Sequence, residues 1–526
     1  MTGTPVGRPD YDCIVIGGGH NGLVCAAYLA RSGRSVLVLE AANQVGGAAI
    51  TREFSPGFRV SACAHLLHLM PGSLIQDLKL DARGLKLAAA RMPTTAIAPD
   101  APPLPIDPQN PTALAARSGA DAAALPAYHA RLRRLVEALQ PVLESAPPRL
   151  GTNSWHDRLA WLRIGWRTRR LGRRDMRELL RIGGMCVQDL LDEHFETPLL
   201  KGALAFDAVL GTCAGPRSPG SVFPLLYRMA GEARGGSALA QPLGGLGAVS
   251  DSLAQAALAA GAAIRTGAMV ERILVREDRA AGVLLVSGEQ ITAGNVISNA
   301  DPKTTFLRLL GGEYLDTGFV RRIAHLRARG VTAKLHLALN RLPQFTGLDR
   351  GALPGRLLLA PSLDYIERAF NHAKYGEFSS APIVELTVPT VSDPGLAPAG
   401  KHVLSAMAQY VPYDRAAGGQ HQRQRFADLV IDALERCAPG LRSSVEAVEL
   451  LTPQDIEREF RISGGHWHHA ELALDQFFMV RPVPGATQYR TPVDGLYLCG
   501  AGCHPGGGVM GIAGRNAARQ LIREAA

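Results

Sequence analysis

The chain has 526 residues, of which 47% are hydrophobic and 20% charged, so it can fill a large core and is not a disordered chain. At this length we expect two to four domains or one large discontinuous pair. The 57 glycines cluster without a period, which excludes collagen-like and low-complexity proteins. The formal charge of +9 is compatible with nucleic acid, an anionic membrane surface or an anionic ligand.

The eight cysteines form no CxxC pair, and no Cys/His cluster has the spacing of structural zinc, so we predict no metal site. This low cysteine density is typical of a reducing compartment, and we expect a cytoplasmic protein of bacterial-type composition. Residues 1–12 lack the apolar stretch of a signal peptide, and no apolar run is long enough to predict a membrane span.

The first forty residues predict a strand, a helix and a second strand. Residues 11–16 and 35–39 are apolar stretches typical of buried strands, and residues 23–32 carry apolar side chains at helical spacing. The turn Gly17-Gly-Gly-His-Asn-Gly22 joins the first strand to the helix. A G-x-G-x-x-G pattern in this position is the fingerprint of a dinucleotide-binding unit.

Each glycine of this fingerprint has a physical purpose. Gly17 permits the tight turn, Gly19 lets a pyrophosphate approach the backbone, and Gly22 lets the helix pack closely on the strand. The helix N-terminus favours the phosphates. Glu40, at the end of the second strand, can accept hydrogen bonds from ribose hydroxyls.

Two further glycine-rich segments favour a flavin over a nicotinamide cofactor. Gly46 and Gly47 follow six and seven residues after the ribose acid, where backbone without side chains can approach FAD. Near the other end of the chain, a short apolar strand runs into Gly500 and Gly502, and a glycine-dense loop over residues 503–514 then opens a helix. Such a loop offers backbone N–H groups to an anion or a flat ring.

A central segment supports the same domain. A glycine-rich turn over residues 243–248 precedes a predicted helix over residues 249–259. Strands are then expected over residues 261–265, 270–275, 281–285 and 296–301.

These segments together resemble the phytoene-desaturase-like flavoproteins of the amine-oxidase and glutathione-reductase superfamily, and within them the group called pyridine nucleotide-disulfide oxidoreductase domain-containing protein 2. The stretches that carry the resemblance cover residues 12–29, 194–212, 361–375, 466–484 and 495–516. The chain lacks the C-x4-C pair of disulfide reductases and a second complete G-x-G-x-x-G unit, which favours a dehydrogenase, desaturase or oxidase.

The resemblance implies an α/β fold in which a discontinuous Rossmann-type FAD-binding domain carries an inserted substrate domain. The expected FAD-binding pieces are residues 1–70, 236–310 and 481–526, with residues 71–235 as a helical cap and 311–480 as a sheet-containing part. FAD would be bound without a covalent link. The predicted cofactor contacts are Gly17, Gly19, Gly22, Glu40, Gly46, Gly47, Val270, Gly500, Gly502, Val509 and Met510.

The function implied is removal of a hydride from a hydrophobic or amphipathic small molecule, with electrons passed to O₂, a quinone or another acceptor. His504, His469 and Glu471 are the candidate catalytic residues, and His65 and His68 could edge the cavity. The residues leave two alternatives open. One is a flavin-binding interaction protein with little turnover, and the other is an amine or amino-acid oxidase, which would need a carboxylate-binding arginine in the cavity.

Residues 155–181 form the most basic segment. Residues 158–181 hold nine arginines against Asp175 and Glu178, a net of +7 of the total +9. Apolar residues recur at helical spacing, and three of the four tryptophans fall between residues 155 and 166. This pattern is typical of an interfacial membrane helix, so peripheral contact with the inner face of a membrane is one interpretation, and a cap helix with its tryptophans packed inwards is the other. No motif supports nucleic-acid binding.

Overall fold

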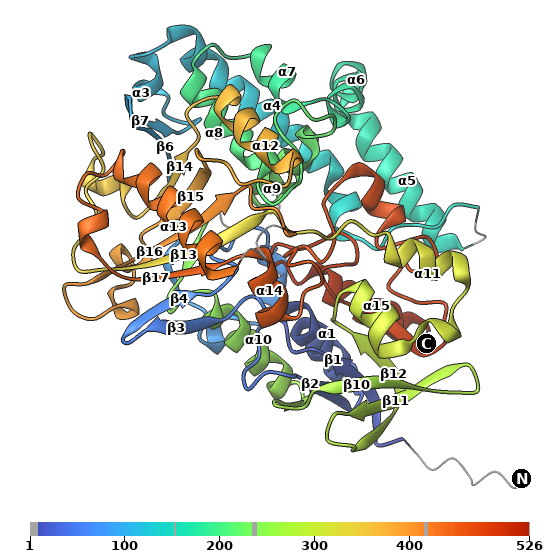
Figure 1. The fold of residues 1–526 in the computed structure, drawn as a ribbon. Coiled ribbons are helices and arrows are strands. Elements are labelled where there is room, and N and C mark those ends of the chain that lie inside the picture. Colours follow the sequence, from blue (N-terminus) through green and yellow to red (C-terminus); the bar gives the residue numbers. More distant parts are fainter. Residues whose placement is uncertain (1–8, 152–153, 234–238, 415–418, 525–526) are drawn as a thin grey trace, which may run out of the picture.

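Two seven-stranded sheets organise the molecule, and Figure 1 shows one in the lower part of the view and the other above it on the left, beside a group of helices. This computed structural model describes residues 9–151, 154–233, 239–414 and 419–524. The predicted domain boundary between residues 235 and 236 lies outside the described residues, and so do residues 1–8 of the segment for which no signal peptide is expected. Within the described parts of the chain, no helix has the length and apolar character needed to cross a membrane.

The first sheet joins strands from the start, the middle and the end of the chain. Its strands are β1 (Tyr11–Ile16), β2 (Val36–Leu39), β9 (Ala263–Arg265), β10 (Val270–Arg276), β11 (Arg279–Leu285), β12 (Gln290–Ser298) and β18 (Leu496–Leu498). The parallel core has the order β18-β12-β1-β2-β9, and β10 and β11 extend β12 as an antiparallel pair. The strand expected over residues 296–301 is the end of β12, which starts at Gln290.

Three helices cover this sheet: α1 (His20–Arg31), α10 (Gly247–Ala259) and α15 (Ile512–Glu524). The strands β1 and β2 are almost wholly apolar because both faces of the parallel part of the sheet are buried. α15 crosses α1 so closely that a Cβ atom at Gly514 would lie 2.0 Å from the carbonyl oxygen of Asn21. The last helix of the chain is therefore packed on the first.

The second sheet has the order β17-β13-β16-β15-β14-β6-β7. Its strands are β6 (Thr94–Ala98), β7 (Ala101–Ile106), β13 (Thr332–Leu339), β14 (Arg356–Leu359), β15 (Ile383–Thr387), β16 (His402–Gln409) and β17 (Val445–Leu451). The expectation that residues 71–235 are a helical cap is therefore wrong for β6 and β7, which complete this sheet. The prolines of β7 make this segment resemble a loop in the sequence. An edge strand tolerates proline because the N–H groups on its outer side need no partner in the sheet.

Most helices from residues 71–235 gather in the upper part of the molecule, beside the second sheet (Figure 1). They are α3 (Thr112–Ala115), α4 (Gly119–Glu144), α5 (Trp155–Arg170), α6 (Gly172–Gly183), α7 (Val187–Asp192), α8 (Pro198–Val209) and α9 (Val222–Ala233). The short helix α2 (Gly72–Asp77) packs on the first domain instead, because its Leu74 is buried in the same apolar cluster as β1 and α1. α12 (Leu363–Lys374), α13 (Gly419–Glu435) and α14 (Pro453–Phe460) come from the other part of the inserted region. Short pairs form from β3 (Thr51–Ser55) with β4 (Phe58–Ser61) and from β5 (Leu87–Ala89) with β8 (Gln241–Pro242).

The core of the first domain extends beyond its predicted boundary at residue 310. Phe319 and Ile323 of α11 (Thr317–Ala324) are buried in the same apolar cluster as β1, α1 and β18. The transition to the second sheet therefore comes after α11, close to the start of β13.

Candidate functional site

The glycine-rich turn after β1 is tightly constrained. Gly17 has a φ of +96°, a conformation that favours glycine, and its N–H donates to the carbonyl oxygen of Leu39 at 2.8 Å. A Cβ atom at Gly22 would lie 2.2 Å from the carbonyl oxygen of Gly17, so only glycine lets α1 sit this close to the strand. Gly19 caps α1 without a side chain, which leaves the first-turn N–H groups open to an anion.

The carboxylate of Glu40 is held beside this turn. Its Oε2 accepts a hydrogen bond from the N–H of Gly18 at 2.7 Å, and its Oε1 accepts one from Ala42 at 2.8 Å. A carboxylate has about four acceptor positions, so it can still accept from hydroxyl groups of a ligand. The N–H of Gly46 donates to the carbonyl oxygen of Gly18 at 2.9 Å, and Gly46 and Gly47 both have positive φ. The second glycine pair therefore lies directly against the first turn.

Val270 is buried at the start of β10, close to the same acid. The neighbouring residue Ala268 donates its N–H to the carbonyl oxygen of Glu40 at 2.9 Å. The strand β10, which begins at Val270, therefore starts close to Glu40.

The C-terminal glycines meet the N-terminal turn through Asn299. Its Nδ2 donates to the carbonyl oxygen of Gly17 at 3.2 Å, and its own carbonyl oxygen would lie 2.5 Å from a Cβ atom at Gly500. Gly502 packs against Pro302, with no space for a side chain. Asn299 thus joins the two glycine-rich turns, a role that the sequence did not indicate although a strand was expected over residues 296–301.

A cavity connects these turns with the second sheet. His20 and Val509 contribute from the two glycine-rich regions, whereas Met510 is buried beside the cavity and does not line it. The wall is mostly apolar, and its apolar members include Leu66, Leu69, Leu210, Tyr227, Met407 and Trp467. A concave apolar chamber between two domains is the usual setting for a small-molecule site.

One side of the cavity is charged, and its centre is Glu385 of β15. Oε1 of Glu385 is 2.9 Å from Nε2 of His65, and Oε2 pairs with the guanidinium of the fully buried Arg356. Arg356 also pairs with Asp207, and Arg228 lies 3.1 Å from Asp207 and 3.5 Å from Glu385. The facing guanidinium groups hold the pKa of the Glu385 carboxyl well below its usual range despite burial, so it is a carboxylate.

Lys334 of β13 lies behind this wall. Its Nζ is 2.5 Å from Nδ1 of His65, and burial lowers its pKa to about 7. Burial and the charge of Lys334 lower the pKa of His65 to about 4, so this imidazole is neutral. His65 therefore links a lysine that titrates near neutrality to a carboxylate in the cavity wall. Both His65 and His68 line the cavity.

The three candidate catalytic residues lie outside the cavity wall. His504 is fully buried, its Nε2 is 2.5 Å from the carbonyl oxygen of Val142 in α4, and its ring packs on Phe477 and Phe478. These contacts give His504 a structural role, since they hold α4 to the C-terminal loop.

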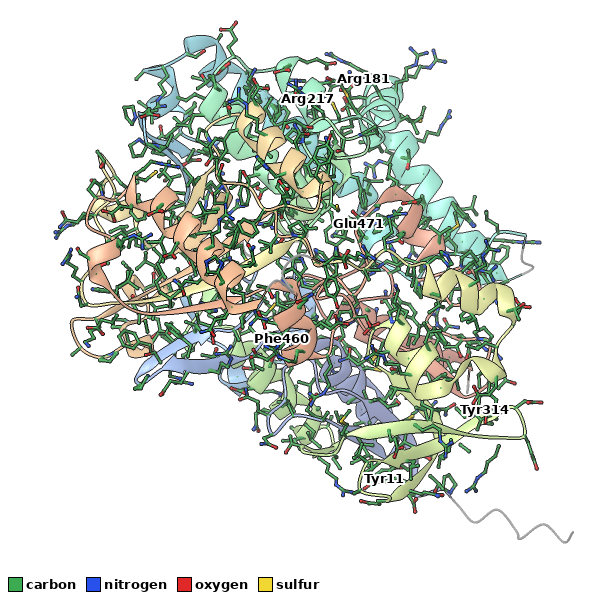
Figure 2. The ribbon with its side chains drawn as sticks, viewed as in Figure 1. Tyr11, Arg181, Arg217, Tyr314, Phe460 and Glu471 are labelled. Carbon is green, nitrogen blue, oxygen red and sulfur yellow. The ribbon has the colours of Figure 1, made fainter. Side chains whose placement is uncertain are left out.

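Glu471, labelled in Figure 2, is also occupied elsewhere, because Oε2 pairs with Nε of Arg327 at 2.9 Å and Oε1 accepts from the N–H of Cys213. The segment around Glu471 forms a turn, in which the N–H of His469 donates to the carbonyl oxygen of His466 at 2.7 Å. His469 has a φ of +59° and lies against Gly502, where burial lowers its pKa. In place of His469, the turn brings Trp467 and His468 to the cavity.

Arg481 fixes this turn against the C-terminal loop. It is fully buried, and burial lowers its pKa to about 10. Its guanidinium donates to six backbone carbonyl oxygens, those of His468, Ala470, Glu471, Gln476, Ala501 and Cys503. Arg481 therefore sets the geometry of one wall of the cavity without contacting a carboxylate there.

The cysteines do not form a redox pair. All eight are free thiols, and burial raises the pKa of Cys503 to about 12. A thiol with a raised pKa is a poor nucleophile. Within the described residues, no group of three or more His, Cys, Asp or Glu side chains could hold a metal ion.

Known proteins share this chain's sequence and architecture. The chain is 39% identical to pyridine nucleotide-disulfide oxidoreductase domain-containing protein 2 of Rattus norvegicus, over 98% of this chain and 94% of the relative. It is 26% identical to one of the subunits of limonene dehydrogenase from Castellaniella defragrans, again over 98% and 94%. A solved putrescine oxidase triple mutant matches its fold with a TM-score of 0.63 at 16% identity, over 98% of this chain and 99% of the other.

These likenesses agree with the predicted architecture of a Rossmann-type domain carrying a mixed-sheet substrate domain. The model of the family "Flavin containing amine oxidoreductase" matches residues 22–522, nearly the whole chain. The chain belongs to the flavin-containing amine oxidoreductase family.

Proposed function

We propose that this protein is an FAD-dependent oxidoreductase that removes a hydride from a hydrophobic or amphipathic organic substrate. The observation that carries the proposal is the cavity that reaches from the glycine-rich turns of the first domain to the second sheet. A cofactor held by the turns and a substrate held by the sheet would share this chamber. Family membership supports the flavin and leaves the substrate open.

The residues around the turns fit an FAD molecule. The open first turn of α1 would hold the pyrophosphate, and Glu40, already fixed by two backbone N–H groups, would accept from the ribose. Gly46, Gly47, Gly500 and Gly502 would let backbone approach the cofactor. When bound, the isoalloxazine ring supplies the hydride acceptor. The buried, protonated thiol of Cys503 supports binding without a covalent link.

The cavity wall supports an apolar substrate. Its apolar side chains would exclude water from the reacting carbon, which protects a hydride transfer. One similar protein is named as part of a limonene dehydrogenase, and limonene is a hydrocarbon. The charged wall at Glu385 would orient a polar end of an amphipathic substrate, and His65 with Lys334 would take up a proton released there. O₂, a quinone or another acceptor would reoxidise the cofactor.

Two alternatives make different predictions. An amino-acid oxidase needs an arginine free to bind a carboxylate, and Arg228 does line the cavity. That arginine is already neutralised by Asp207 at 3.1 Å and Glu385 at 3.5 Å, which disfavours this reaction. A flavin-binding interaction protein would keep the cofactor but show no turnover.

The decisive experiment has two readouts. Mass spectrometry of small molecules released from the denatured protein should find FAD in about equimolar amount. Anaerobic addition of apolar candidate substrates, including monoterpenes and longer isoprenoids, should bleach the absorbance near 450 nm. A colourless protein that does not take up added FAD would refute the proposal. A yellow protein that no apolar, amphipathic, amine or amino-acid substrate bleaches would favour the interaction role.

A further inference from the structure

The outward face of α5 carries an apolar stripe. Trp155, Leu159, Leu162 and Trp166 follow one another at helical spacing, and at about 100° per residue they fall on one narrow face. Trp155 is 65% exposed, Leu162 66% and Trp166 58%. The interpretation in which this face packs on the domain is therefore wrong.

The opposite face of α5 anchors the helix. Asp157 is buried, and its carboxylate accepts a hydrogen bond from Gln488 and pairs with Arg149. Trp161 turns inwards, donates its indole N–H to the carbonyl oxygen of Arg149, and packs edge-on against Phe478. The helix thus docks through one side and leaves the apolar stripe in solvent.

Arginines border the stripe on both sides. At about 100° per residue, Arg158 and Arg169 flank one edge, and Arg163, Arg167 and Arg170 flank the other. Arg170 stacks over the ring of Trp166 at 4.7 Å from its centroid. Within the described parts of the chain, Arg163, Arg167 and Arg169 pair with no carboxylate, so their charge is available to a partner.

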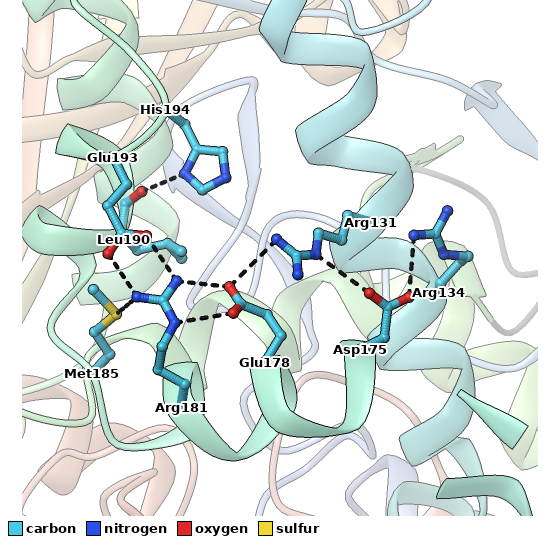
Figure 3. Close-up of polar contacts among 9 residues, drawn as sticks. All are labelled: Arg131, Arg134, Asp175, Glu178, Arg181, Met185, Leu190, Glu193 and His194. Atoms are coloured by element: carbon cyan, nitrogen blue, oxygen red, sulfur yellow. Dashed lines mark hydrogen bonds and ion pairs between the residues drawn. The ribbon is translucent and has the colours of Figure 1, made fainter. Parts of the chain in front are cut away.

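α6 continues the basic surface because its acids face the protein. Figure 3 shows Asp175 and Glu178 turned towards Arg131 and Arg134 of α4, and Glu178 also pairs with Arg181. Its other face presents Arg173, Arg174 and Arg177 to solvent, together with Leu180, which is 77% exposed. Asp175 and Glu178 form ion pairs within the protein, whereas the arginines and apolar side chains of this surface face the solvent.

We propose that α5 and α6 form a docking surface for an anionic lipid membrane. Exposed tryptophan and leucine side chains would enter the boundary between headgroups and acyl chains, and the bordering arginines would meet lipid phosphates and carboxylates. A bilayer surface fits a mixed stripe of this kind, whereas a nucleic acid offers no apolar layer for Leu159 or Leu162. The surface lies apart from the cofactor turns, so this inference does not depend on the proposed reaction.

The test is sedimentation of the purified protein with vesicles of phosphatidylglycerol and phosphatidylcholine at low salt. The protein should pellet with these vesicles, and pure phosphatidylcholine should bind it weakly. Each arginine near an anionic surface contributes about fivefold to binding, so R163Q/R167Q/R174Q should weaken it on the order of 100-fold. Exposed arginines on other elements give a matched control, R276Q/R321Q/R350Q, which should pellet nearly as the wild type does.

Tryptophan fluorescence tests the apolar part separately. Vesicles should shift the emission of the wild type to shorter wavelength, and the W155S/W166S variant should lose most of that shift while keeping its thermal stability. Absence of wild-type pelleting at low salt would overturn the proposal. Equal weakening by the control triple variant would also overturn it, and so would tight binding of duplex DNA without binding of vesicles.

Discussion

Replacing Gly22 with alanine probes the nucleotide turn with a single methyl group. Gly22 is the third residue of α1, where alanine is the better helix former by about 0.5–1 kcal/mol. The added Cβ atom would lie 2.2 Å from the carbonyl oxygen of Gly17, about 1 Å inside van der Waals contact. The helix would have to move away from the end of β1, so the intrinsic helix gain is opposed by a steric cost.

The magnitudes decide which effect prevails. Forcing one extra carbon into a packed site costs about 1–3 kcal/mol, which exceeds the helix gain. The same movement displaces the first-turn N–H groups from their positions around a pyrophosphate. Losing one charge-assisted hydrogen bond of about 2 kcal/mol would weaken cofactor binding about 30-fold. We therefore expect a folded protein with a modestly lower melting temperature and a large loss of flavin.

The assay is the ratio of absorbance at 450 nm to that at 280 nm after purification, followed by titration with FAD. Gly165→Ala in α5 is the matched control, because it is also a helical glycine but no atom lies within 4 Å of its added Cβ. That variant should keep its flavin and gain a little stability. Full flavin occupancy with unchanged affinity in Gly22→Ala would show that this turn does not hold the cofactor.

Three further predictions concern the second domain and its attachment. Arg481→Met leaves six carbonyl oxygens without their donor and should lower the melting temperature by several degrees, whereas a change below 1 °C in a thermal scan would contradict the role given to this arginine. Burial lowers the pKa of Lys334 from 10.5 to about 7. Between pH 7 and pH 10.5, this lysine therefore binds a proton more readily in the unfolded chain than in the folded protein. Stability should therefore rise by about 1.4 kcal/mol per pH unit over that window, and Lys334→Met should lose this slope in urea unfolding at pH 7–10. Arg356→Met alone should cost about 3–5 kcal/mol because Glu385 stays charged, and Arg356→Met with Glu385→Leu should cost less; additive losses would refute their coupling.

The sequence predicted the first domain well because its signals are local. The turn at Gly17–Gly22 and the strand at Tyr11–Ile16 depend on neighbours in the chain, and the structure places both as expected. The second sheet was harder to predict. Its edge strand β7 contains three prolines, which match a loop, and only pairing with β6 makes it a strand.

The residues that line the cavity were harder to predict from the sequence. His504 and Glu471 were chosen for their residue type and position, but the direction of each side chain depends on distant partners, Val142 and Arg327. One feature of the sequence does indicate the charged wall of the cavity. A charged residue inside an otherwise apolar strand, such as Glu385 in β15, needs a buried partner. The sequence does not identify that partner, because Arg356 lies on another strand, β14.

The pairing of β18 with β12 has a consequence for synthesis of the chain. β1 forms early, its neighbour β12 follows much later, and β18 with α15 comes at the very end. At about 5–20 residues per second, a ribosome needs roughly half a minute to two minutes to make a chain of this length. For most of that time, the first turn waits without the strand and loop that face it. Once β12 has been made, the edge of its last residues stays unpaired until β18 follows. Cofactor capture should be among the last events of folding, and a protein truncated before residue 496 should accumulate as an aggregation-prone apoprotein.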